Sequence, residues 1–365
     1  MRVLVAPDKF AGTLTAVEAA RAIAEGWARQ APGDELDLVP MADGGPGFLD
    51  VLHHALGGEL EAVVVPRAFG GEVPAAVLRV GTTAYVEAAQ ACGLHLADDR
   101  DPETAHTRGV GALLAAAVDG GATRVVVGLG GTGTNDGGAG LLSALGATSE
   151  PVGALDRGPA GLATVDSVDL APARERLAGV ELVAASDVDN QLLGLRGATN
   201  TYGPQKGVTA ERLTWVEGTL ERLVAATDRR TSLSPGAGAA GGLGFALLLL
   251  GATRQPGVEL VAEAVGLPER AARADLVVTG EGAFDFSSRS GKVPYGVASV
   301  AQRALQPCVA LAGQVLVGSR EMRALGVESA YAVVDLVGEE RAFADPAGAL
   351  ADLAERVART WSPSR

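Results

Sequence analysis

Short runs of β-branched and apolar residues alternate along the chain with segments of helical periodicity, and this alternation most constrains the fold. Between the first two runs, apolar residues recur at helical spacing from residue 15 to residue 30, with Thr13 or Thr15 as the N-cap. The pattern predicts α/β layering that begins with a right-handed βαβ unit. The runs lie at residues 2–6, 35–39, 60–65, 124–127, 182–185, 276–279 and 308–311.

The length of the chain predicts two domains, because 365 residues exceed what one hydrophobic core usually supports. Residues 72–86 read as extended strands around a turn at Gly81, which predicts a hairpin or meander and a candidate domain boundary. Ligand sites often lie where two domains meet, so we expect a cleft enzyme.

Composition narrows the class of partner. A net charge of −14 repels polyanions, so nucleic acid is an unsuitable partner, although a few cations and a metal ion can still neutralise a bound nucleotide. Cys92 and Cys308 lack metal-site spacing and are expected to be small buried hydrophobes. No apolar run is long enough for a signal peptide or a membrane span, which predicts a cytoplasmic protein.

Six glycine-rich segments coincide with polar residues, and several directly follow a predicted strand, where ligands bind in open parallel sheets. The first segment, residues 7–15, places Asp8 and Lys9 after the first strand, either against a ligand or in an ordinary strand-to-helix turn. The second, residues 40–47, places Asp43 after the next strand. The two carboxylates can share one cleft, unless the second segment is a plain turn.

The third segment, GLGGTGTNDGGAG at residues 128–140, also follows a strand and contains GxGxxG. A dinucleotide site requires a long helix after the third glycine, whereas Asn135, Asp136 and two further glycines interrupt here. Backbone amides with the hydroxyls of Thr132 and Thr134 better suit a phosphate cradle. Dinucleotide binding and a plain tight turn are the alternatives.

The fourth segment, residues 186–207, carries two acids and two bases after another strand. Asp187 and Asp189 are two residues apart, so in extended backbone both face one way, as magnesium ligation or base catalysis requires. Arg196 and Lys206 suit a substrate carboxylate or phosphates. The alternative is a solvated loop with local ion pairs.

The fifth segment, SPGAGAAGGLG at residues 234–244, has no reactive side chain, so its backbone amides either bind an anion or allow close helix contact. The four histidines lack zinc-site spacing, and the sequence contains no GxSxG motif of a serine hydrolase.

The sixth segment, residues 279–296, places Glu281 and Asp285 near Lys292. A glycine precedes this lysine, as at the end of a Walker A loop. However, valine follows the lysine and the earlier glycine of that motif is missing, so a P-loop NTPase is excluded.

Taken together and in this order, the six segments resemble the glycerate kinase family over essentially the whole chain. The sharpest matches are GGTGTNDGGAG, SDVDN with LLG, GPQKG, GAGAAGGLG and DLVVTGEGAFD ending in GK. The resemblance implies two unlike α/β domains, one Rossmann- or flavodoxin-like with a parallel sheet and the other inserted into it. We expect the discontinuous domain at residues 1–75 and 290–365 and the inserted domain at residues 76–289.

The resemblance also implies magnesium-dependent phosphoryl transfer from ATP to D-glycerate, with 2-phosphoglycerate favoured over 3-phosphoglycerate as the product. It implies a small-molecule substrate, no nucleic-acid or membrane partner, and a monomer or homodimer.

Phosphoryl transfer requires in-line positioning and neutralisation of developing charge, and we assign residues to these roles accordingly. The predicted catalytic residues, as base or charge clamp, are Asp187, Asp189, Lys206 and Lys292. The predicted substrate-binding residues are Asp8, Lys9, Asp43, Arg196 and Asp285. The predicted nucleotide-binding residues are Gly130, Gly131, Thr132, Thr134, Asn135, Asp136, Gly238 and Gly241. The predicted metal ligands are Asp187 and Glu281.

Two positions depart from the family pattern. Ala11 stands where the family usually has lysine, although Lys9 lies two residues earlier, and Pro46 stands where it usually has glutamate. The alternatives are therefore a kinase for a related hydroxy acid, or a family member that binds a metabolite with little or no glycerate turnover.

Overall fold

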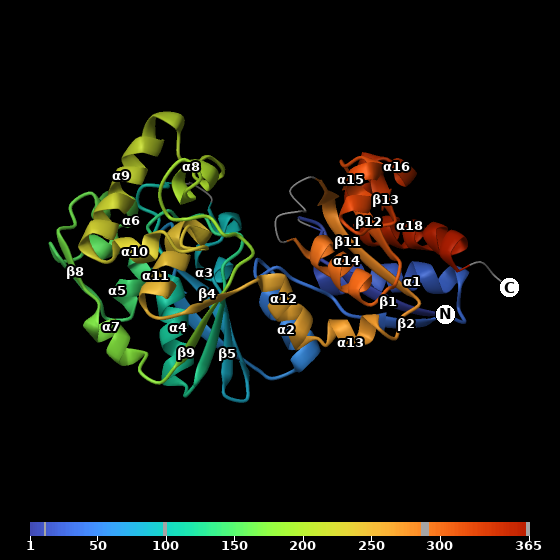
Figure 1. Cartoon of the computed structure of the whole chain (residues 1–365), viewed down its shortest axis with the longest axis horizontal. Coiled ribbons are helices and arrows are strands. Elements are labelled where there is room, and N and C mark those ends of the chain that lie inside the picture. The colour runs from blue at the N-terminus through green and yellow to red at the C-terminus, as the bar shows by residue number, and fades with distance from the viewer. Residues whose placement is uncertain (11, 98–100, 286–291, 363–365) are drawn as a thin grey trace. The chain divides into compact units, whose positions relative to one another are not determined.

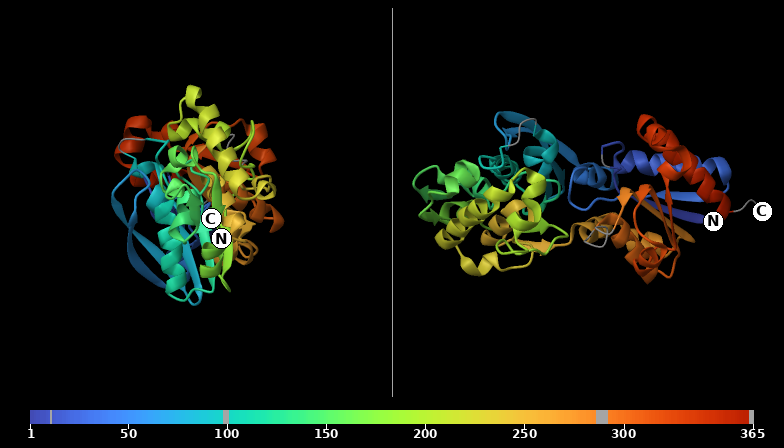
Figure 2. Two further views of the ribbon diagram at one scale, coloured as in Figure 1. Left: turned by 90° about the vertical axis from the view of Figure 1, so that its left-hand side faces the viewer. Right: turned by 90° about the horizontal axis from the view of Figure 1, so that it is seen from above.

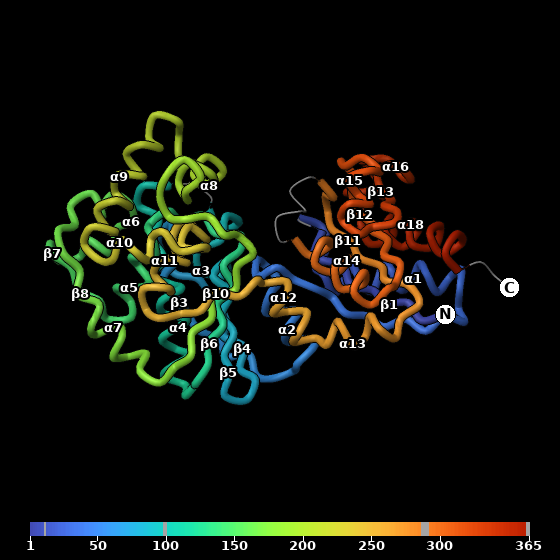
Figure 3. Tube along the Cα trace, viewed as in Figure 1, coloured from blue at the N-terminus to red at the C-terminus, as the bar shows by residue number. Residues whose placement is uncertain are grey.

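A computed structural model describes residues 1–10, 12–97, 101–285 and 292–362. The chain divides into two compact units, the first formed by Met1–Asp43, Asp50–Leu56 and Gly257–Arg365, and the second by Gly44–Leu49 and Gly57–Pro256. Figure 1 and Figure 3 trace the chain from the first unit into the second and back at α12. The second unit is therefore inserted into the first, and the expected fold class of two unlike α/β units is confirmed.

The first unit is built on a five-stranded sheet in which every pairing is parallel. The strand order is β13-β12-β11-β1-β2. Counted within this unit, that is the 2-1-3-4-5 order of flavodoxin-like folds, in which ligands bind where the strand order reverses. The strands are β1 (Arg2–Pro7), β2 (Glu35–Leu38), β11 (Leu276–Phe284), β12 (Cys308–Val315) and β13 (Ser329–Ala332).

Helices cover both faces of this sheet, as continuous apolar runs in parallel strands require. Val278 packs in one core with Ile23 of α1 and Leu353 of α18. The next residue along the strand, Val277, points to the opposite face and is also buried. The helices of this unit are α1 (Ala16–Gln30), α2 (Phe48–Leu56), α12 (Gly257–Ala264), α13 (Leu267–Ala271), α14 (Val293–Arg303), α15 (Ser319–Ala324), α16 (Val333–Val337), α17 (Glu339–Ala344) and α18 (Pro346–Trp361).

The second unit contains a mixed six-stranded sheet with the order β10-β9-β6-β5-β4-β3. Its first four strands are parallel, and the last three form an antiparallel meander, which confirms the hairpin expected at residues 72–86. A separate antiparallel pair joins β7 (Thr148–Glu150) and β8 (Ser167–Asp169). The six strands are β3 (Glu59–Pro66), β4 (Glu72–Val80), β5 (Thr83–Glu87), β6 (Arg124–Gly128), β9 (Glu181–Ala185) and β10 (Thr253–Gln255).

Helical segments of the second unit bury their apolar residues in one core with this sheet, including Leu113 of α4, Leu141 of α5 and Phe245 of α11. Two short helices of this unit, α5 and α11, begin at the ends of glycine-rich segments, so their packing in the core fixes the ends of those segments. The helices are α3 (Ala89–Cys92), α4 (Arg108–Asp119), α5 (Ala139–Ala144), α6 (Gly158–Leu162), α7 (Ala171–Arg176), α8 (Ala198–Tyr202), α9 (Ala210–Ala226), α10 (Arg229–Ser232) and α11 (Leu243–Leu249), with 3-10 turns η1 (Leu94–Leu96), η2 (Ala154–Asp156), η3 (Pro204–Lys206) and η4 (Ala239–Gly242).

The inserted unit was expected at residues 76–289, but its boundaries lie elsewhere in the structure. Strand pairing decides which unit a segment joins. β3 pairs along its whole length with β4 and so belongs to the second sheet. β11 lies between β1 and β12 in the first sheet. The inserted unit therefore starts and ends earlier in the chain than the sequence suggested.

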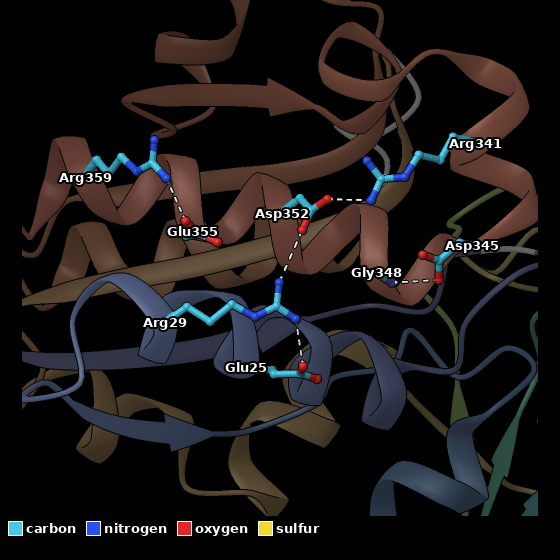
Figure 4. A network of polar contacts seen from close by, with 8 residues as sticks. All are labelled: Glu25, Arg29, Arg341, Asp345, Gly348, Asp352, Glu355 and Arg359. Atoms are coloured by element: carbon cyan, nitrogen blue, oxygen red, sulfur yellow. Dashed lines mark hydrogen bonds and ion pairs between the residues drawn. The ribbon is translucent and has the colours of Figure 1, made fainter.

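Close contact between α1 and α18 closes one face of the first sheet (Figures 1 and 2). Thr15 begins α1 with a capping box that includes Glu18, which confirms one of the two candidate caps. Figure 4 shows Asp352 of α18 accepting hydrogen bonds from Arg29 of α1 (3.2 Å) and from Arg341 of α17 (2.6 Å). The three helices are thus joined by polar contacts as well as by their apolar faces.

Gly26 allows the backbones of α1 and α18 to approach, since a Cβ at this position would lie 1.8 Å from the carbonyl oxygen of Ala351. We predict that Gly26→Ala lowers the free energy of unfolding by about 2–3 kcal/mol, because overpacking outweighs the better helix propensity of alanine. Denaturant unfolding measures this. Gly33→Ala is the matched control, because a Cβ there meets nothing within 4 Å. Equal stabilities of the two variants would show that the approach of α1 to α18 does not require glycine at position 26.

Candidate functional site

The first unit gathers charged residues where its strand order reverses, at the carboxyl ends of β1 and β11. Asp8 follows β1 directly, and its amide donates a hydrogen bond to the carbonyl of Gly280 (2.8 Å), which extends the strand pairing. Glu281 lies on β11 one residue beyond that carbonyl, and Asp43 follows β2. Parallel pairing thus brings three carboxylates from distant parts of the sequence to one edge of the sheet.

Two lysines stand between these carboxylates. The ammonium of Lys9 lies 3.5 Å from the carboxylate of Asp8 and 3.7 Å from that of Asp43. The ammonium of Lys292 lies 3.6 Å from Glu281 and 3.6 Å from Asp285. The structure therefore brings together the predicted site residues of the first, second and sixth segments. Ala11 lies outside the described residues, as does the part of the sixth segment at residues 286–291.

The environment of Asp8 differs from that of an ordinary surface carboxylate. Burial raises the pKa of Asp8 from 3.8 to about 7, and the neighbouring carboxylates of Asp43 and Glu281 act in the same direction. The positive charge of Lys9 opposes this shift. Buried carboxylates with such a raised pKa are enriched at functional sites.

In the second unit, backbone hydrogen bonds join four of the glycine-rich segments to one another. The amide of Gly130 donates to the carbonyl of Gly44 (3.0 Å), that of Gly137 to Gly241 (3.0 Å), and that of Gly238 to Asn190 (2.8 Å). These amides are therefore already engaged inside the protein. The amides of Gly130 and Gly238 have acceptors within the protein, and the expected contact of these residues with a nucleotide stays a prediction.

Asp136 holds the third segment in shape. Its carboxylate is fully buried and accepts hydrogen bonds from the amide and hydroxyl of Thr107 (both 2.8 Å) and from the amides of Gly138 (3.0 Å) and Gly140 (3.1 Å). These four donors engage the carboxylate, so it positions the loop, and its expected contact with a nucleotide stays a prediction. Sequence reasoning missed Thr107, which has no motif of its own.

Lys206 is buried beside this loop. Its side chain comes from η3, its residue is 3% exposed, and its ammonium donates to the carbonyl of Thr134 (2.8 Å). Within the described part of the chain no carboxylate forms an ion pair with it. Burial lowers the pKa of Lys206 from 10.5 to about 8, while Cys92 and Asp136 act to raise it.

Asn135 lies next in sequence to the acceptor of Lys206 and is 1% exposed. Neither its side-chain nitrogen nor its side-chain oxygen has a hydrogen-bond partner in the part of the chain that the structure describes. Leaving such groups unsatisfied costs roughly 1–3 kcal/mol each, so an ordered water or a ligand is their natural partner. Gly241 packs tightly against the same loop, since a Cβ there would lie 1.9 Å from the carbonyl oxygen of Thr134 and 2.8 Å from the ammonium of Lys206.

The remaining predicted residues of this unit have more varied surroundings. Asp187 is half-buried, whereas Asp189 and Arg196 are exposed. The neighbouring Asn190 fixes the loop, because its amide donates to the carbonyl of Arg196 (2.7 Å) and the hydroxyl of Tyr202 donates to it (2.9 Å). Arg196 and Lys206 therefore do not share one environment, although they are close in sequence.

Gly131 and Thr132 join the glycine loop to the segment after β5. The carbonyl of Gly131 accepts a hydrogen bond from Leu94 (3.0 Å), and Thr132 is buried in a bridge with Gly93. Both residues therefore join the glycine loop to the segment at Gly93 and Leu94. Their expected contact with a nucleotide stays a prediction.

Glu87 is a buried carboxylate that sequence reasoning also missed. It ends β5 and accepts hydrogen bonds from the amides of Gly47 and Leu49 (both 3.2 Å), so it holds the turn that contains Pro46. The sequence offered one signal that could have identified Glu87, namely an acidic residue at the end of an extended segment, as at Asp8 and Asp43.

No three His, Cys, Asp or Glu side chains come together as a metal cage among the described residues. The two predicted metal ligands, Asp187 and Glu281, belong to different units. Carboxylates of the first unit, Glu281 and Asp285 among them, are oxygen donors of the kind that Mg²⁺ prefers.

In the described residues, no helix is both long and apolar enough to cross a membrane.

Comparison with known proteins identifies the family. The model of the glycerate kinase family matches residues 3–362. A glycerate kinase of Bacillus subtilis is 39% identical, with 100% of this chain and 97% of the relative covered, and a glycerate 2-kinase of Escherichia coli is 36% identical, with 93% and 92% covered. A crystal structure of a putative glycerate kinase 2 from Salmonella typhimurium superposes with a TM-score of 0.82 at 34% identity, covering 99% of this chain and 98% of that one. The chain therefore belongs to the glycerate kinase family.

Proposed function

We propose that this protein transfers the terminal phosphoryl group of ATP to D-glycerate, with Mg²⁺ as the metal and 2-phosphoglycerate as the product. The names of its relatives support the activity, and the glycerate 2-kinase of Escherichia coli supports the position of transfer. The reaction joins two anions, so the protein must supply positive charge and hydrogen-bond donors in a site that excludes water.

The observation that carries the proposal is the pair formed by Lys206 and Asn135. Among the described residues, the buried ammonium of Lys206 forms no ion pair with a carboxylate and the buried side-chain amide of Asn135 has no partner, and both are costly in the free protein. An anionic ligand lowers both costs, because Lys206 supplies positive charge and the side-chain nitrogen of Asn135 supplies a hydrogen-bond donor. The carboxylate of glycerate and a phosphoryl oxygen both have this chemistry.

The charged cluster of the first unit fits Mg²⁺ with phosphates. Magnesium in nucleotide sites is usually held by one or two carboxylates together with phosphate oxygens and water, and it neutralises charge as the phosphoryl group moves. Glu281 and Asp285 would hold it. Lys292 lies 3.6 Å from both carboxylates and is placed to contact phosphate oxygens as the charge clamp.

The acceptor hydroxyl needs a carboxylate that takes its proton. Asp8 is the stronger candidate, because it is buried at the reversal of strand order and held by Lys9, whereas Asp189 is exposed on a loop. The expectation that Asp187 or Asp189 is the base stays a competing prediction.

Substrate identity is tested by measuring ADP release with D-glycerate, L-glycerate and related hydroxy acids. We expect D-glycerate to give the highest kcat/KM. A higher value for another hydroxy acid would assign the chain to the alternative suggested by Pro46 and Ala11. ATP binding without ADP release for every acid would contradict the kinase assignment.

Lys206→Met should lower kcat/KM by about 100-fold or more while the protein stays folded, because methionine fills the space without charge. In the wild type, kcat/KM should fall about tenfold per pH unit above pH 8, since only the protonated amine binds an anion and the pKa of Lys206 is lowered to about 8. Arg222→Met is the control, because Arg222 is an exposed cation on α9. A wild-type profile that stays flat to pH 9.5 would remove Lys206 from the anion site.

Asp8→Asn should lower turnover by about 100-fold or more, and Asp189→Asn by less than tenfold. Asparagine can still accept the hydrogen bond that the amide of Lys9 donates to Asp8 (2.7 Å), so the local fold is kept. Single-turnover kinetics with circular dichroism as a folding control make the comparison. The reverse order of the two effects would return the base to Asp189.

A further inference from the structure

An apolar cavity of about 260 Å³ lies wholly within the first unit, at the carboxyl ends of β1, β11 and β12. Its volume is several times that of a water molecule and approaches the roughly 300 Å³ at which small-molecule sites begin. Phe10, Val334, Phe343 and Leu350 supply apolar walls. A cavity with such walls favours a ligand that is itself largely apolar.

Few polar groups reach this cavity. The hydroxyl of Thr13 is already used, because it donates to the carbonyl of Phe10 (3.0 Å). Gln314 adds a side-chain amide, which can donate and accept at once. The edge of a purine ring presents both donors and acceptors around a flat apolar face, so this combination of walls and one amide suits it.

Phe343 adds an aromatic face to the opening. Its residue is 66% exposed, which is unusual for a phenylalanine that lines a cavity. A ring left open in this way is available to stack on a planar ligand such as a nucleobase. Phe343 lies on α17, and Arg341 of the same helix donates a hydrogen bond to Asp352 of α18 (Figure 4). This bond helps to hold α17 without a contribution from the Phe343 ring.

The cavity adjoins the charged cluster along the chain. Gly282 and Ala283 line it and directly follow Glu281, and Phe10 lies two residues after Asp8. A ligand with an apolar ring and a polyphosphate matches this order of apolar cavity and charged cluster. D-glycerate does not, because it is small and polar throughout.

We propose that the purine ring of the phosphoryl donor binds in this cavity and that its phosphates bind at the adjoining cluster of Lys9, Lys292 and the carboxylates. The first unit is then the nucleotide-binding unit. This inference rests on the proposed kinase function. It differs from the expectation that the glycine loops of the second unit hold the phosphates, since several of their amides are engaged within the protein.

Calorimetric titration of ADP and of inorganic tripolyphosphate, both with Mg²⁺ and without glycerate, tests the proposal. Phe343→Ala should weaken ADP binding about tenfold and change tripolyphosphate binding by less than twofold, because only ADP carries the base. Val334→Trp, which fills the cavity, should have the same selective effect. Leu305→Ala is the control, since Leu305 is 90% exposed in the same unit and does not line the cavity.

Lys206→Met completes the test, because it changes the second unit alone. If the nucleotide binds to the first unit, this variant weakens ADP binding less than Phe343→Ala does. The proposal is overturned if Phe343→Ala leaves ADP affinity within twofold of wild type, or if Lys206→Met weakens ADP binding more than Phe343→Ala does. Since Phe343 is exposed, its variant stays informative even if Val334→Trp fails to fold. Glycerate turnover does not enter these readouts, so a failure of the kinase function is recognised separately.

Discussion

The parallel pairing of β1 with β11 is the constraint on which the rest of the structure depends. It joins the start of the chain to the segment that follows the inserted unit, and every hydrogen bond of the ladder helps to fix the register. That register places Asp8 beside Gly280 and thereby next to Glu281. A shift by one residue would turn each side chain to the opposite face of the sheet and separate the carboxylates.

The two units carry polar sites of opposite character. In the first, four carboxylates and two lysines lie at the edge of the sheet, which suits a metal ion with a polyphosphate. In the second, a buried lysine bonds a carbonyl group and forms no ion pair among the described residues, and a buried amide has no partner there, which suits an anion. Both arrangements cost stability in the free protein, and such local costs are usual where a fold is adapted to a ligand.

The sequence predicted those features that local patterns determine. Apolar periodicity located most of the strands, Thr15 was one of two candidate caps for α1, and the extended pattern at residues 72–86 identified the hairpin. The positions of Asp8, Asp43 and Glu281 followed from the rule that ligand sites lie at strand ends. Family membership followed from several motifs in a fixed order, because their combination is far more specific than any one of them.

Features that depend on non-local partners could not be predicted. Glycine-rich loops look alike in sequence whether their amides face a ligand or another loop, and here Gly130 and Gly238 face Gly44 and Asn190. The role of Asp136 depends on Thr107, and the junctions between units depend on strands that pair across loops.

We propose that this chain moves a phosphoryl group from ATP to the hydroxyl of glycerate. Phosphorus-31 NMR of the protein with ATP, Mg²⁺ and D-glycerate tests it directly, because a phosphate ester, inorganic phosphate and the phosphates of ATP give separate signals. We expect the phosphomonoester signal of 2-phosphoglycerate to grow at the same rate as the signals of ADP. Loss of ATP to ADP and inorganic phosphate alone, or no loss of ATP while the nucleotide binds, would contradict it.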